Sequence, residues 1–137
     1  MRDALLSQSR PILFALCQGG VEDVHRWGNR TGHSWRISDD IFPAWDRMMW
    51  IASIQAGIWN YSGPYGFNDL DMLGKSIQSS GPRLTILEVG NGKLTLEEQR
   101  THFNLWALSK SPLLIGTHVC SPLDKKPNLI SAASFDF

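Results

Sequence analysis

The polar residues best suited to chemistry fall at the ends of predicted strands. Gln18 comes at the end of one strand, Arg36 and Asp40 at the end of the next, and Asp69 and Asp71 at the end of a third. In a parallel array of strands and helices, working residues gather at the carboxyl ends of the strands. Carboxylates beside an arginine suit sugar chemistry. Glycoside hydrolysis needs one carboxyl group to protonate the leaving oxygen and another to attack or to activate water.

These residues also have a purely structural interpretation. Aspartates often cap helices and turns, and Asp40 is placed to N-cap a helix that begins near Phe42. The six tryptophans of this short chain are equally ambiguous. An indole fills a protein core as readily as it stacks on the apolar face of a sugar. The residue types and their spacing leave both interpretations open.

Alternating strands and helices are needed to bring the polar residues together. We predict strands at 11–17, 33–38 and 111–116, the first and last of them buried on both faces, and helices at 21–27, 42–58 and 95–109. The second helix is expected to bury Trp45, Met48, Met49, Ala52 and Ala56. Thr95 is expected to N-cap the third helix, with two glutamates in its first turn. The pattern predicts an α/β fold built from βα units.

Composition excludes several classes of partner. Thirteen basic residues balance thirteen acidic ones, so we expect neither nucleic acid nor an anionic membrane as a partner. No apolar run is long enough to span a bilayer, and residues 1–10 do not have the pattern of a signal peptide. Cys17 and Cys120 have no metal-ligand spacing, and no cofactor is expected. Asn29 and Asn60 each begin a glycosylation sequon, a triplet that chance also supplies.

Four motifs give the chain a family resemblance. In order they are SWRISDDI at 34–41, GPYGFNDLDML at 63–73, EVGNG at 88–92 and KSPLLIG at 110–116. Together they resemble the family 27 glycoside hydrolases, the α-galactosidases or melibiases, and their spacing is most similar to that of fungal members. The resemblance implies retaining hydrolysis of terminal α-galactosides by a (β/α)₈ TIM barrel. Residues 1–116 are then expected to supply about strands five to eight, and 117–137 to form a divergent tail.

The resemblance also implies roles for individual residues. The acid/base aspartate of the family stands four residues after the motif's arginine, which here is Asp40 and not Asp39. Arg36 matches the sugar-binding arginine, and Asp71 matches the aspartate that binds galactose hydroxyls. Asp69 is expected to brace the loop.

Three further positions match the surroundings of the family's site. Cys17 and Gln18 match residues that line the galactose pocket, and Trp35 is expected to be a structural residue near the site. The family nucleophile belongs to a K-x-D motif on the fourth strand. The chain has no such motif at a strand end, so that role is unfilled.

The chain departs from the family in several places. Gly19 and Phe67 stand where many members have tryptophan. Residues 74–87 separate Leu73 from Glu88, which are usually adjacent; we consider a retained intron and a genuine surface loop as explanations. We expect the isolated chain to be inactive and to self-associate through open barrel edges. A non-catalytic, galactose-binding remnant is the alternative, and N-acetyl-α-galactosamine is an alternative substrate. By family, the parent protein is expected to be secreted and glycosylated.

Overall fold

The computed structural model describes residues 1–73 and 94–114. Three short parallel strands, β1 (Ala15–Leu16), β2 (Ser34–Arg36) and β3 (Phe67–Asp69), form a sheet in the order β1-β2-β3. Ala15 pairs with Ser34 and Arg36 pairs with Asp69. The predicted insert at 74–87 and the tail at 117–137 lie outside the described residues.

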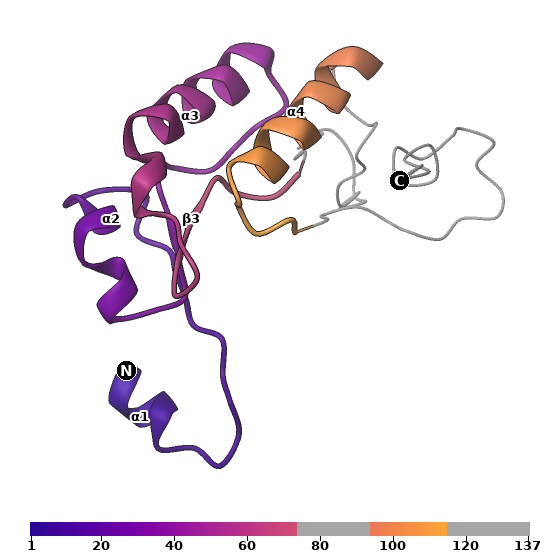
Figure 1. Ribbon diagram of the computed structural model, residues 1–137. Coiled ribbons are helices and arrows are strands. Elements are labelled where there is room, and N and C mark those ends of the chain that lie inside the picture. The colour runs from indigo at the N-terminus through magenta and orange to yellow at the C-terminus, as the bar shows by residue number, and fades with distance from the viewer. Residues whose placement is uncertain (74–93, 115–137) are drawn as a thin grey trace, which may run out of the picture.

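Helices connect and cover the strands (Figure 1). They are α1 (Arg2–Leu6), α2 (Val24–Trp27), α3 (Trp45–Ile58) and α4 (Leu96–Leu108), with 3₁₀ turns η1 (Gly28–Arg30) and η2 (Trp59–Tyr61). Helices α3 and α4 contact each other, whereas α1 lies apart from them and buries no residue. Within the described part of the chain, no helix is long and apolar enough to cross a membrane.

The predicted strand at 11–17 is shorter and less buried than expected. Only Ala15–Leu16 is a strand, and along 11–17 exposed residues alternate with half-buried ones. Among the described residues β1 pairs only with β2, so it is an edge strand, and its outer side chains reach solvent. The prediction of burial on both faces was therefore wrong for this segment.

The predicted strand at 111–116 is also wrong where the structure describes it. Residues 111–114 form no strand, and Leu113 and Leu114 are 43% and 54% exposed. One backbone hydrogen bond, from the Leu73 N–H to the Leu114 carbonyl at 3.1 Å, connects this segment to the residues after β3. Residues 115 and 116 lie outside the described ranges.

The helix predicted at 42–58 exists, but it begins at Trp45. Ala44 is its N-cap and gives no side-chain cap, so the interpretation of Asp40 as an N-cap is wrong. Its buried positions are Met48, Ile51 and Gln55; Met49 and Ala56 of the predicted face are exposed. The helix itself was predicted correctly, but its buried face differs from the predicted one, because Met48 is the only predicted residue that is fully buried.

The prediction for α4 is confirmed at its start. The Thr95 hydroxyl accepts a hydrogen bond from the Glu98 N–H, and the Glu98 carboxylate accepts one from the Thr95 N–H at 2.7 Å. This reciprocal pair is a capping box, which satisfies two backbone donors that the helix itself cannot satisfy. Helix α4 then buries Trp106 completely.

A buried polar network centred on Asn68 joins the sheet to α3. Its Oδ1 accepts from Trp35 Nε1 at 2.7 Å, and its Nδ2 donates to Gln55 Oε1 at 2.8 Å and to the Ile58 carbonyl at 2.9 Å. Gln55 in turn donates to the Ser109 carbonyl, just after α4. Because Asn68 is fully buried, these bonds form away from water and orient β2, β3 and both long helices.

We predict that Asn68→Ala destabilises the fold by at least about 3 kcal/mol, because it leaves the Trp35 N–H, the Gln55 amide oxygen and the Ile58 carbonyl without this partner. Urea unfolding followed by tryptophan fluorescence measures the change. Asn60→Ala is the matched control, because Asn60 is exposed, and it should change stability by less than about 0.5 kcal/mol. Equal losses in the two variants would contradict the role given to Asn68.

Candidate active site

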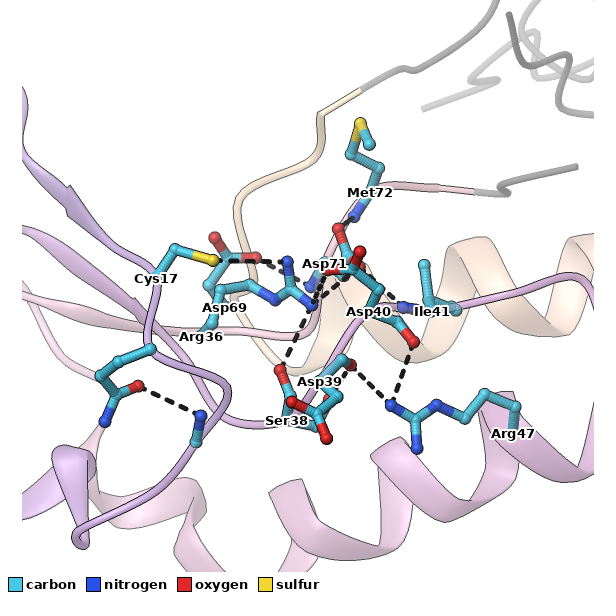
Figure 2. A network of polar contacts seen from close by, with 12 residues as sticks. Cys17, Arg36, Ser38, Asp39, Asp40, Ile41, Arg47, Asp69, Asp71 and Met72 are labelled. Carbon is cyan, nitrogen blue, oxygen red and sulfur yellow. Dashed lines mark hydrogen bonds and ion pairs between the residues drawn. The ribbon is translucent and has the colours of Figure 1, made fainter. Parts of the chain in front are cut away.

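Arg36, the last residue of β2, lies at the centre of a polar cluster (Figure 2). Its Nη2 is 2.9 Å from Asp71 Oδ2 and 3.3 Å from Asp40 Oδ1, and it also donates to the Ser38 carbonyl at 3.2 Å. The arginine side chain is only 10% exposed. A single guanidinium nitrogen therefore holds two carboxylates at the carboxyl end of the sheet.

Asp71 is a buried carboxylate of the cluster, with a side chain only 6% exposed. Its Oδ2 also accepts from the Ile41 N–H at 2.8 Å, and its Oδ1 accepts from the Met72 N–H at 2.7 Å. The buried Trp106 indole donates to the Asp71 carbonyl at 2.7 Å. The backbone of Asp71 has a φ of +79°, in the left-handed region that side chains other than glycine rarely adopt. Such a conformation persists where surrounding contacts enforce it.

Asp69 lies beside Asp71, to its left in Figure 2. Its Oδ1 accepts from the Asp71 N–H at 2.8 Å, so it stabilises the turn that carries Asp71. Burial raises the pKa of Asp69, and repulsion from Asp71 adds to the rise, while the hydrogen bond from Asp71 and the nearby Arg36 oppose it. These contacts support the bracing role expected for Asp69.

Asp40 differs from Asp71 in its access to solvent, because its side chain is 71% exposed. The loop that carries it is held from below by Arg47 of α3, whose Nη2 donates to the Asp39 carbonyl at 2.6 Å and to the Asp40 carbonyl at 3.0 Å. The Arg47 guanidinium also lies over the Trp50 ring, 4.4 Å from its centroid. Arg47 thus fixes the backbone of Asp40, while the Asp40 carboxylate contacts Arg36 and is largely exposed to solvent.

Cys17 and Gln18 follow β1 beside this cluster. The Cys17 thiol is exposed, and Arg36 Nη1 donates to its Sγ over 3.9 Å. The Gln18 amide is engaged by its own loop, because Nε2 donates to the Val21 carbonyl at 2.5 Å and Oε1 accepts from the Gly20 N–H at 3.1 Å. Cys17 therefore touches the cluster directly, and sugar contact by Gln18 stays a prediction.

The structure brings together Arg36, Asp40, Asp71, Asp69 and Cys17, all of them predicted from the sequence. Trp35 lies buried behind them and donates to Asn68, as its supporting position requires. Sequence reasoning missed Arg47, the Ile41 N–H and Trp106 as contacts of the carboxylate loops. The described residues contain no group of histidine, cysteine, aspartate or glutamate side chains that could hold a metal ion.

Comparison with known proteins agrees with this geometry. The family described as Alpha galactosidase A (melibiase) matches residues 2–132. This chain is a member of the melibiase family. Among curated relatives, probable α-galactosidase B of Aspergillus oryzae is 50% identical over 117 residues, which cover 85% of this chain and 23% of the relative. The α-galactosidase of Cyamopsis tetragonoloba is 43% identical over 133 residues, 97% of this chain and 29% of the relative.

Solved structures show the same similarity. Crystalline α-galactosidase I of Mortierella vinacea superposes with a TM-score of 0.72 at 30% identity, over 85% of this chain and 31% of that one. The described strands and helices are consistent with part of the barrel of such melibiases. The chain spans about a quarter of the length of the curated relatives it matches.

His102 of α4 is a buried histidine close to this site. Its ring packs edge-on against Trp106, with centroids 4.1 Å apart, and its Nε2 has no hydrogen-bond partner among the described residues. Burial lowers the pKa of His102 to about 4, although the negative charge of Asp71 opposes the shift. The neutral ring is therefore the form that fits the fold.

We predict that His102 makes the chain less stable in acid. A depressed pKa means that the unfolded chain takes up the proton first, so stability falls as the pH drops from about 6.5 towards 4, by up to roughly 3 kcal/mol. His102→Gln should remove this part of the pH dependence. Because the raised pKa of Asp69 acts in the opposite direction in both proteins, the comparison is the difference between their urea unfolding curves at pH 7 and pH 4.5. An equal change in stability between pH 7 and pH 4.5 in the unchanged chain and in His102→Gln would contradict this role of His102.

Proposed function

We propose that this chain is a segment of an α-galactosidase that hydrolyses terminal, non-reducing α-D-galactosides with retention of configuration. The observation that carries the proposal is the bridge formed by Arg36, whose Nη2 holds both the enclosed Asp71 and the exposed Asp40. Family membership and the α-galactosidase names of the relatives support the substrate.

In this proposal the two carboxylates have different tasks. Asp71, held by Arg36 and by two backbone N–H groups, is a fixed acceptor for sugar hydroxyls. Arg36 orients Asp71 and contributes positive charge beside the galactose ring. Cys17 and Gln18 line the same galactose-binding pocket. Asp40 reaches solvent, where a leaving group can approach, so it is the general acid that protonates the glycosidic oxygen and then the base that activates water.

The attacking carboxylate is assigned to another part of the parent protein. In a retaining enzyme it stands about 5 to 5.5 Å from the acid/base, on the other side of the scissile bond. Asp71 is not assigned to attack, because the matching aspartate of the family faces the sugar hydroxyls and not the anomeric carbon. We assign the nucleophile to barrel strand four and the described strands to the set from five to eight. Secretion and glycosylation at Asn29 or Asn60 belong to the same proposal.

Replacing Asp40 by Asn tests the acid/base assignment. The segment is placed in a complete enzyme by exchanging it for the matching part of the Aspergillus oryzae relative. Asp40→Asn preserves size but cannot donate the proton, so turnover of galactosides with poor leaving groups should fall roughly 10²- to 10⁴-fold. Asp39→Asn is the matched control, because Arg36 contacts Asp40, and it should retain most of the activity. Damage from Asp39→Asn alone would move the assignment by one residue.

The purified 137-residue chain is predicted to hydrolyse no aryl α-galactoside above background, because it supplies the acid/base but not the nucleophile. It is also predicted to self-associate, since an open sheet edge offers unpaired backbone groups to another chain. Sedimentation of the purified chain tests association, and release of the aryl group tests activity on the same sample. Turnover that disappears in Asp40→Asn would show that another carboxylate attacks and would refute the division of roles.

A further inference from the structure

A cavity lies at the opposite end of the sheet from Arg36. It has a volume of about 430 Å³, and residues that precede each strand line it: Phe14 before β1, His33 before β2 and Tyr65 before β3. Arg36 and the carboxylates around it belong to the carboxyl end of the same strands. The cavity is therefore separate from the glycosidase site.

Three arginines from three different segments line this cavity. Arg2 comes from α1, Arg10 from the segment before β1, and Arg30 from η1. Among the described residues that line the cavity there is no aspartate or glutamate. The chain as a whole has no net charge, so this concentration of positive charge is local.

The pairing of the arginines sets these three apart. Arg26, Arg36, Arg47 and Arg100 each contact a carboxylate or a backbone carbonyl. Arg2, Arg10 and Arg30 have no ion pair or hydrogen bond among the described residues. The described arginines that lack a partner are thus the same ones that line the cavity. An arginine presents a planar fork of N–H donors that matches the oxygens of phosphate or sulfate.

The tautomer of His33 adds a donor to the lining. Its Nδ1 accepts from the Phe14 N–H at 3.0 Å, so the proton of the neutral ring is on Nε2. Gln8 and Thr31 add further polar groups. The volume lies in the range of pockets that hold small organic ligands, so it has room for an oxyanion that is free or esterified.

We propose that the cavity between α1 and the amino ends of the strands binds a tetrahedral oxyanion, phosphate or sulfate, through Arg2, Arg10 and Arg30. The site does not depend on the glycosidase assignment, because it shares no residue with the cluster around Arg36. The attraction is electrostatic and directional, so binding weakens as salt screens the three charges.

Titration of the full 137-residue chain with inorganic phosphate, followed by calorimetry and ³¹P NMR, tests the proposal. We expect saturable binding with one site per chain, competition by sulfate, and weakening at high salt. Arg10→Ala and Arg30→Ala should each weaken binding about tenfold or more, as the loss of a charged hydrogen bond predicts. Arg26→Ala is the matched control, since Arg26 is exposed and paired with Asp23, and it should change affinity by less than about twofold.

Further arms of the same experiment make the outcome decisive. A hexose phosphate that binds more tightly than inorganic phosphate identifies an ester as the ligand, and equal or weaker binding identifies the free ion; both support the site. Arg30→Gln repeats the test with an uncharged side chain that is longer than alanine. Far-UV circular dichroism checks the fold of every variant. Binding that does not saturate, or that Arg26→Ala weakens as much as Arg30→Ala, overturns the proposal.

Discussion

The buried ion pair between Arg36 and Asp71 is the interaction on which the rest of the site depends. Both side chains are at least 90% buried, so either charge would be costly without the other. The pair also fixes positions, because Asp71 binds the Ile41 N–H next to Asp40 and Arg36 binds the Asp40 carboxylate itself. The loop after β2 is thereby tied to the loop after β3. The two proposed functional carboxylates are placed by one shared contact.

The core serves this arrangement from behind. Trp35 and Trp106 are both fully buried, and each uses its indole N–H as a donor, to Asn68 and to the Asp71 carbonyl respectively. The first bond fixes β2 against β3, and the second fixes α4 against the turn that holds Asp71. The abundance of tryptophan in this chain is thus explained in part by two buried donors that each orient a functional strand end.

The sequence predicted the clustering of Arg36, Asp40 and Asp71 better than it predicted the sheet. Arg36, Asp40 and Asp71 were found because their spacing matches a family pattern, and that pattern follows the local chain. Capping by Thr95 was equally local. The strands at 11–17 and 111–116 were predicted from their apolar content. Apolar content cannot reveal whether a neighbouring strand is present to pair with the segment and bury it. The contacts of Arg47 could not be predicted, because its partners are backbone carbonyls, which every residue possesses. The burial of His102 could not be predicted either, because it depends on tertiary packing around α4.

The left-handed backbone at Asp71 limits which residue types this position can hold. With φ at +79°, asparagine, aspartate and glycine are the residues that the backbone tolerates most readily. Glycine has no side chain, and asparagine is neutral and would remove the buried charge partner that lies 2.9 Å from Arg36. Conformation thus reduces the choice to a few residues, and electrostatics selects one of them. Substitution at position 71 is therefore constrained twice, by the backbone conformation and by the buried charge of Arg36.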